Sequence, residues 1–150
     1  MLQLTKRTEY GLIALVHLVD REGEFVPARE IGEQYPVPRR LLAEVLKDLQ
    51  REGLVESQRG ASGGYSLARP AEHVTLGDVV TALEGRPSLT GCESLGAYSA
   101  GGCDVEPVCP IKSPIQRVRA GIWSVLQGTT LRDLARGPIH ITNTNPLSAS

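Results

Sequence analysis

The sequence predicts a mainly α-helical chain with one small β-hairpin and a long helix toward its C-terminus. Apolar residues recur at helical spacing in several segments, and one glycine-rich run lies between two short apolar runs. The 150 residues are enough for one ordinary domain, and only 4% of them are aromatic. We therefore expect a single helical domain with an aliphatic core and an added helical arm.

The first two helices are expected within residues 5–34. Thr5 can cap a helix that runs to about Asp20, and apolar residues surround nearly the whole of that helix. Such a pattern is typical of a central, buried helix. Pro27 suits the first turn of a short second helix over residues 28–34, which Tyr35 and Pro36 end.

A third helix is expected between Pro38 and Gly53. One face of it is apolar, with residues at positions i, i+3, i+4 and i+7: Leu42, Val45, Leu46 and Leu49. The opposite face carries basic and other residues without a large apolar side chain: Arg39, Arg40, Ala43, Lys47 and Gln50. Helix, short turn and helix in this order predict a helix-turn-helix.

A β-hairpin is expected directly after the third helix. Residues 54–58 and 65–68 read as short strands, and the glycine-rich residues 59–64 form the tip between them. A hairpin at this place predicts a wing, so the segment as a whole reads as a winged helix-turn-helix. Thr75 and Asp78 then cap a helix over residues 76–83.

The rest of the chain divides into a loop, an arm and a tail. Residues 86–112 are rich in Gly, Ser and Pro and hold all three cysteines. Residues 113–136 read as a long helix to about Gln127 and a short last helix capped by Thr130. The expected units are thus residues 1–85, 86–112, 113–136 and a disordered tail over 137–150. The long helix carries one apolar stripe, which predicts pairing with a second chain: Ile115, Val118, Ile122, Val125 and Leu126.

Charge and hydropathy exclude several classes of protein. The formal net charge is −1, so the chain is not a uniformly basic chromatin-type protein. Residues 36–70 nevertheless carry six basic and four acidic side chains, while residues 71–112 carry two and six. No run of 18 apolar residues and no signal-peptide pattern occurs, so we expect a cytoplasmic chain outside the membrane.

Several motifs resemble one bacterial family. They are residues 4–10 (LTKRTEY), 53–55 (GLV), 59–67 (RGASGGYSL), 76–80 (LGDVV), Trp123 and residues 130–134 (TLRDL). Over residues 2–135 the chain resembles the winged-helix regulators that include the iron–sulfur cluster regulator and the nitric-oxide-sensing repressor (IscR-like and NsrR-like). The resemblance implies a homodimer paired through the long helix, and a transcriptional regulator that binds a double-stranded DNA operator.

Four basic residues are the candidate DNA contacts. Arg39 and Arg40 open the third helix, where donors reach guanine edges or phosphates, and Lys47 is better placed for phosphate. Arg59 stands at the base of the wing, and wings of the family that the chain resembles enter the minor groove, whose negative potential favours arginine. An alternative is a winged-helix module that binds protein and has no role on DNA.

The cysteines Cys92, Cys103 and Cys109 are the candidate metal ligands. Thiolates favour iron–sulfur clusters, zinc and Cu(I), and the spacing lacks the C-x-x-C pair of a zinc ribbon. The family resemblance implies an iron–sulfur cluster, either 2Fe–2S or 4Fe–4S. Lys112 stands where the iron–sulfur cluster regulator has its histidine ligand, whereas Glu9 keeps the carboxylate that the nitric-oxide sensor takes from the partner subunit.

Two further interpretations of the cysteines stay open. They could form a metal-free thiol–disulfide switch, or they could be loop thiols in a regulator without a cofactor. An enzyme is not expected, because no C-x-x-C motif and no histidine in the cysteine loop supply redox or base chemistry. His17, His73 and His140 are expected to pack rather than to bind metal.

Overall fold

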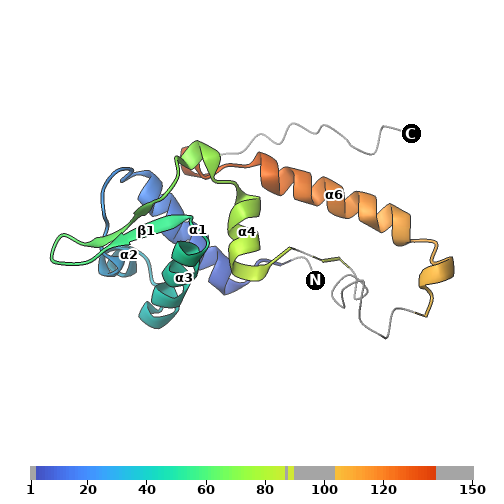
Figure 1. Ribbon diagram of the computed structural model, residues 1–150, viewed down its shortest axis with the longest axis horizontal. Coiled ribbons are helices and arrows are strands. Elements are labelled where there is room, and N and C mark those ends of the chain that lie inside the picture. The colour runs from blue at the N-terminus through green and yellow to red at the C-terminus, as the bar shows by residue number, and fades with distance from the viewer. Residues whose placement is uncertain (1–2, 87, 90–103, 138–150) are drawn as a thin grey trace.

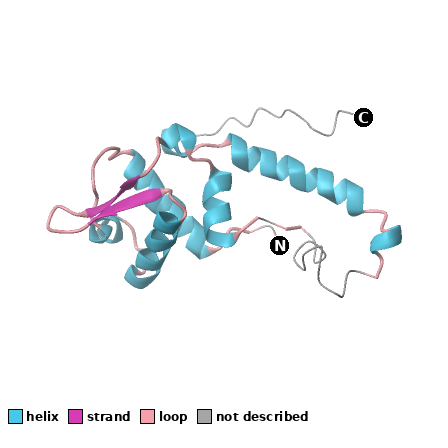
Figure 2. Ribbon diagram, viewed as in Figure 1, coloured by secondary structure: helices cyan, strands magenta, loops and turns pink. Residues whose placement is uncertain are grey.

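The computed structural model describes residues 3–86, 88–89 and 104–137. Figure 1 shows a compact helical body with a hairpin at one end and a long helix that leaves from the other. Helices dominate, and the hairpin is the one sheet among the described residues (Figure 2). In chain order the elements are α1 (Lys6–Val19), α2 (Ala28–Gln34), α3 (Arg39–Arg51), β1 (Val55–Gln58), β2 (Gly64–Leu67), the 3-10 helix η1 (Ala71–His73), α4 (Leu76–Glu84), the 3-10 helix η2 (Glu106–Val108), α6 (Lys112–Gly128) and α7 (Leu131–Arg136).

Threonines start three of the helices. The Thr5 hydroxyl accepts a hydrogen bond from the Thr8 backbone N–H at the start of α1. Thr75 and Thr130 each form a reciprocal capping box, with Asp78 in α4 and Asp133 in α7. These caps satisfy backbone N–H groups that have no partner within the helix. The starts of α1, α4 and α7 are therefore as the sequence predicts.

The hairpin pairs Val55 with Leu67 in an antiparallel register. The first strand begins one residue later than the hydropathy pattern predicts, and the second begins and ends one residue earlier. Tyr65 also forms a bridge to Val26, which ties the wing to the segment before α2. Gly64 permits this approach, because a Cβ at that position would lie 2.3 Å from the Val26 backbone.

The core lies between α1, α2, α3, η1, α4 and α7. Its fully buried side chains are aliphatic, as expected: they include Leu15, Leu18, Ile31, Leu42, Leu46, Leu49, Leu54 and Leu131. In α1 the apolar residues are not all covered, since Ile13 and Val16 are only half-buried. That helix is thus central on one side and partly open on the other within a single chain. No helix among the described residues is long and apolar enough to span a bilayer.

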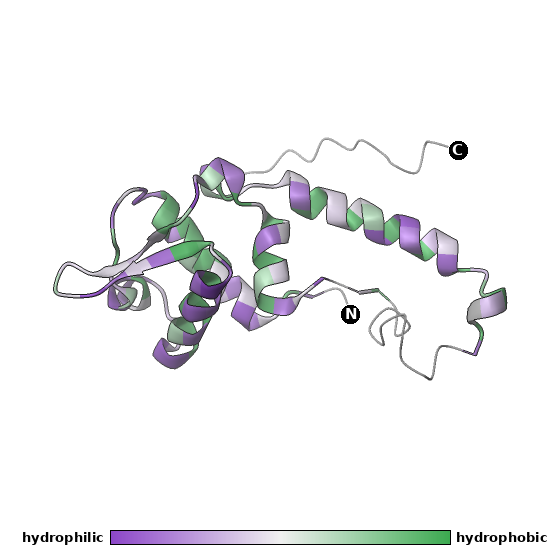
Figure 3. Cartoon of the chain, viewed as in Figure 1, coloured by the Kyte–Doolittle hydropathy of each residue, from purple (hydrophilic) through white to green (hydrophobic). Residues whose placement is uncertain are grey.

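The long helix α6 has no buried residue. In Figure 3 apolar and polar segments alternate along it, and the helix runs away from the body. It begins at Lys112 and ends at Gly128, one residue beyond the expected bounds at each end. Where it ends, the Leu76 N–H donates to the Thr129 carbonyl at 2.7 Å, so α6 joins the body beside the start of α4.

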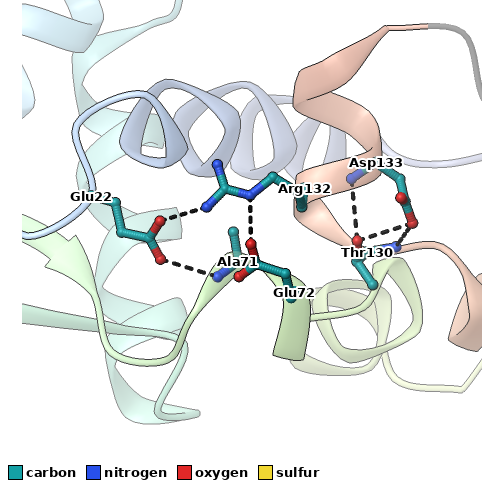
Figure 4. Close-up of polar contacts among 6 residues, drawn as sticks. All are labelled: Glu22, Ala71, Glu72, Thr130, Arg132 and Asp133. Atoms are coloured by element: carbon teal, nitrogen blue, oxygen red, sulfur yellow. Dashed lines mark hydrogen bonds and ion pairs between the residues drawn. The ribbon is translucent and has the colours of Figure 1, made fainter.

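The last helix, α7, packs back on the body. Leu131 is fully buried against the core, and its N–H donates to the Val74 carbonyl at 2.9 Å. Arg132 forms ion pairs with Glu22 at 2.6 Å and with Glu72 at 2.8 Å, as Figure 4 shows. These contacts fix the C-terminal end of α6 to the winged part of the molecule.

Candidate functional site

The outward face of α3 presents the basic residues that the sequence singles out. The inward face is at most 2% exposed, which fixes the rotation of the helix about its axis: Leu42, Val45, Leu46 and Leu49. Arg39, Arg40 and Lys47 are exposed on the other side. The Arg40 side chain is 94% exposed and its Nε lies 3.2 Å from the Glu44 Oε1, an exposed pair of small energy that a DNA ligand can displace.

Side-chain contacts hold α3 against its neighbours. The Asp48 carboxylate is only 16% exposed and pairs with Arg7 of α1 and with Arg51. The Gln50 side chain donates to the Ser57 hydroxyl at 2.9 Å, which joins the end of α3 to β1. Sequence periodicity gives no signal for the contacts with Arg7 and Ser57, because both residues lie outside α3.

The wing extends from the body on the side opposite α6 (Figure 1). Arg59 is exposed at the start of its tip. Gly60 has a φ of +107°, in the region that favours glycine, and a Cβ on Gly63 would lie 2.2 Å from the Gln58 carbonyl oxygen. The tip therefore depends on glycine for its shape, and Arg59 directly follows β1, the strand that the Gln50–Ser57 hydrogen bond joins to α3.

The candidate metal ligands lie in different parts of the chain. Cys109 is half-buried between η2 and α6, in a shallow surface hollow that Pro107, Lys112 and Gln116 also line. Cys92 and Cys103 lie outside the described residues. Glu9 lies on α1, half-buried, with its Oε2 at 2.5 Å from the Lys6 Nζ. Within the described residues no three His, Cys, Asp or Glu side chains converge.

The two ends of α6 are far apart. Seventeen helical residues span about 25 Å at 1.5 Å per residue. The winged body holds the C-terminal end, whereas η2 and Cys109, which come just before Lys112, lie at the other end (Figure 1). The fold therefore holds Cys109 away from the body to which Glu9 of the same chain belongs.

His17 has a packing role in this structure. Its Nε2 lies 3.1 Å from the Glu30 Oε1, and its ring meets the edge of Tyr35 with centroids 5.7 Å apart. The hydrogen bond from His17 is the main cause that lowers the pKa of Glu30, and Arg21 adds to it. These contacts join α1 to α2.

A helix-turn-helix with an exposed basic face and an adjoining glycine-rich wing defines a winged-helix DNA-binding protein of the transcription-regulator class. Comparison with known proteins gives the family. A model of the Rrf2 family, described as iron-dependent transcriptional regulators, matches residues 4–137, and the chain belongs to this family. It is accordingly a regulator and not an enzyme, and the expected fold class is confirmed.

Solved structures of several regulators are similar over most of the chain. CymR, the global cysteine regulator of B. subtilis, has 27% identity and a TM-score of 0.70, with 91% of this chain and 98% of that chain covered. The oxidized form of Staphylococcus aureus CymR has 28% identity and a TM-score of 0.69, over 93% and 100%. IscR of T. potens has 28% identity and a TM-score of 0.67, over 90% and 87%.

Proposed function

We propose that the chain works as a homodimer that holds operator DNA through α3 and the wing, and that a cysteine-ligated iron–sulfur cluster controls this binding. The observation that carries the DNA part is the face of α3. Its inward residues are fully packed, while Arg39, Arg40 and Lys47 stand exposed beside the wing.

Each basic residue has a distinct role in this proposal. Arg39 and Arg40, at the start of α3, contact guanine edges or phosphates in the major groove. Lys47, two turns later, contacts phosphate, and Arg59 enters the minor groove with the wing. Binding should weaken steeply with added salt, because each phosphate contact releases a counterion.

The dimer part of the proposal depends on the apolar stripe of α6. Val118 and Val125 are each 41% exposed within the single chain. Two more exposed apolar residues precede the helix, since Ile111 is 55% and Val108 is 79% exposed. Within α6, the steps of three, four and three residues from 115 to 125 are the spacing of a helix that pairs with another helix. A second copy of α6 would cover this stripe.

The donor set fits an iron–sulfur cluster. Three thiols are the ligands such clusters prefer, and some members of the family bind clusters. Cys92, Cys103 and Cys109 would hold it, and Glu9 of the partner subunit would supply the remaining ligand. When bound, the cluster would supply a centre sensitive to redox state, oxygen or nitric oxide, and three thiolates suit either a 2Fe–2S or a 4Fe–4S cluster.

The placement of Glu9 and Cys109 favours a ligand from the other chain. The arm α6 carries Cys109 away from its own winged body, so a carboxylate from a paired body is better placed to reach it. Ligation across the pair would couple the cysteine segment of one chain to the α1 of the other. Gain or loss of the cluster would then change the DNA affinity, provided that the two states differ in the positions of their winged bodies.

The cluster part is tested by anaerobic purification, a visible absorption spectrum, and counts of iron and sulfide per chain. We expect a coloured protein, and a colourless one after any one cysteine is replaced by alanine. Glu9→Ala should leave the cluster formed but shorten its lifetime in air, whereas Glu33→Ala, a matched change on α2, should not. Reconstituted protein without iron contradicts the cluster, and an indifferent Glu9→Ala contradicts only the ligand assignment.

A metal-free thiol switch is the second candidate, and one observation favours it. Among the similar structures is an oxidized form of CymR, and Cys109 is half-buried at the surface rather than enclosed. In that case iron would be absent, and mild oxidation would block thiol labelling and change DNA affinity. Mass analysis of the labelled chain before and after oxidation separates the two candidates.

A further inference from the structure

Two side-chain contacts fix the angle between α4 and α6. At the first, the Thr75 hydroxyl donates to the Gln127 Oε1 at 2.9 Å. The Gln127 side chain lies over Gly77, where an added Cβ would meet its Nε2 at 2.6 Å. The absence of a side chain at Gly77 therefore lets the last turn of α6 sit directly on the first turn of α4.

The second contact is at the opposite end of α4. The chain leaves α4 at Gly85, and the Cζ of Arg86 lies 5.6 Å from the centroid of the Trp123 ring in α6. A guanidinium over an indole face at this distance is a cation–π contact, and tryptophan is the strongest aromatic partner for it. The first turn of α4 thus contacts α6 directly, and Arg86, two residues after the last residue of α4, contacts α6 through Trp123.

The C-terminal end of α4 is in turn fixed to α1. Glu84, the last residue of α4, accepts hydrogen bonds from the Thr5 backbone N–H and hydroxyl and from the Thr8 hydroxyl. The α4 helix therefore cannot turn without moving α1. Any freedom in the direction of α6 would have to come from the contacts at Gln127 and at Trp123.

We infer that Arg86 is a positioning residue: stacked on Trp123, it braces α6 at a fixed angle to α4 and thereby sets the distance between the two winged bodies on DNA. The inference rests on the proposed dimer, because the angle between body and arm matters only when two arms are joined. Arg86 is also the residue through which the chain passes from α4 into the loop, so the brace stands where the cysteine segment begins.

The strength of the cation–π contact limits how much Arg86 can change the preference for one half-site spacing. An exposed cation–π contact changes an equilibrium by about two- to fivefold, so two braces in a dimer give on the order of tenfold. Removing the brace cannot change the preference for one half-site spacing by more than this. Affinity for a single half-site should be unchanged, since α3 and the wing are untouched.

The experiment compares the full-length chain with its Arg86→Ala and Arg86→Lys variants. Trp123 is the single tryptophan of the sequence, so intrinsic fluorescence reports the contact without a label. A duplex is first selected from random DNA with the wild-type chain. Affinities are then measured on a single half-site and on duplexes whose half-site spacer is lengthened or shortened by one or two base pairs. Arg69→Ala, an exposed arginine after β2, is the matched control.

We expect Arg86→Ala to shift the Trp123 emission to longer wavelength and to reduce the preference for the best spacer by up to about tenfold. Arg86→Lys should restore part of both, and Arg69→Ala should change neither. Unchanged emission in Arg86→Ala overturns the brace, independently of DNA. Changed emission with an unchanged spacer preference overturns the positioning role. A wild-type chain that binds no duplex with two half-sites overturns the proposed function, and the positioning role with it.

Discussion

The winged body and the α6 arm bury their apolar residues to very different degrees. In the body, Leu42, Val45, Leu46 and Leu49 of α3 are at most 2% exposed. In α6 no residue is buried, although its stripe is as regular as that of α3. The same spacing of apolar residues is thus packed into the core in α3 and left unburied in α6.

This difference in burial shows that the described part of a single chain has no surface that fully covers the apolar stripe of α6. Apolar stripes of this length are stable in water when another surface covers them. The arm is attached only toward its C-terminal end, through Gln127, Trp123 and α7, and the described elements of its own chain fully bury no residue of the stripe. Stability of the body should therefore be a property of one chain, and that of the arm a property of two.

The sharpest test of this contrast uses matched truncations. Leu46→Ala should lower the free energy of unfolding of the body by about 2–5 kcal/mol, because it leaves a cavity in a packed core. Val118→Ala, in a chain kept monomeric by Ile122→Glu, should change it by less than about 0.5 kcal/mol. Urea unfolding followed by circular dichroism measures both. Equal losses in the free energy of unfolding for the two truncations would show that the arm is packed within one chain.

A charge on the stripe should separate the two chains. Ile122→Glu would place a carboxylate in an apolar seam in both subunits, which should raise the dimer dissociation constant by about 100-fold or more. Ser124→Glu, on the exposed opposite side of α6, should have little effect. Analytical ultracentrifugation at micromolar concentration is the measurement. An Ile122→Glu chain that stays dimeric contradicts the claim that two α6 helices pair through this stripe.

Changes on the DNA face should leave the fold intact and weaken binding. Arg40→Ala should cost about 1–3 kcal/mol of operator affinity if Arg40 contacts a base, and Arg59→Ala should act through the wing. Arg117→Ala, an exposed arginine of α6, is the control. Fluorescence anisotropy with the selected duplex, at several salt concentrations, gives the affinities. If neither Arg40→Ala nor Arg59→Ala weakens binding, α3 and the wing are not the reading surface.

The smallest expected effect concerns Glu84, which joins α4 to α1. Burial works against it, but the hydrogen bonds from Thr8 and Thr5 hold the pKa of Glu84 below its ordinary value of 4.5. A lowered pKa in the folded state adds stability above the ordinary value and loses it as the pH falls through the folded one. Glu84→Gln should remove under about 1 kcal/mol near neutral pH and flatten the acid limb of the stability curve. An acid limb identical to that of the wild type contradicts the role of this carboxylate.

The sequence predicts the elements better than their contacts. Caps at Thr5, Thr75 and Thr130 and the periodicity of α3 are local signals, and the structure confirms the starts of these helices. The pairing of Arg132 with Glu22, across 110 residues, has no local signal. The attachment of α7 to the body has no local signal either, because it depends on contacts with residues far away in the sequence.

The same distinction between local signals and distant contacts holds for the candidate site. Amphipathic spacing places Arg39, Arg40 and Lys47 on the outward face of α3, and the structure shows them exposed there. The roles of these residues and of Arg59 on DNA stay predictions. For the metal ligands, spacing alone cannot bring residues of two chains together. The set of Cys92, Cys103, Cys109 and the partner's Glu9 therefore also stays a prediction.

The most direct test of the account is the number of chains on one operator. The selected duplex, labelled with a fluorophore, is titrated with the wild-type chain and followed by sedimentation velocity. We predict that two chains bind each duplex together, and that Ile122→Glu chains bind it singly and more weakly. One wild-type chain per duplex, held as tightly by Ile122→Glu, would contradict the claim that the arm joins two winged bodies for DNA binding.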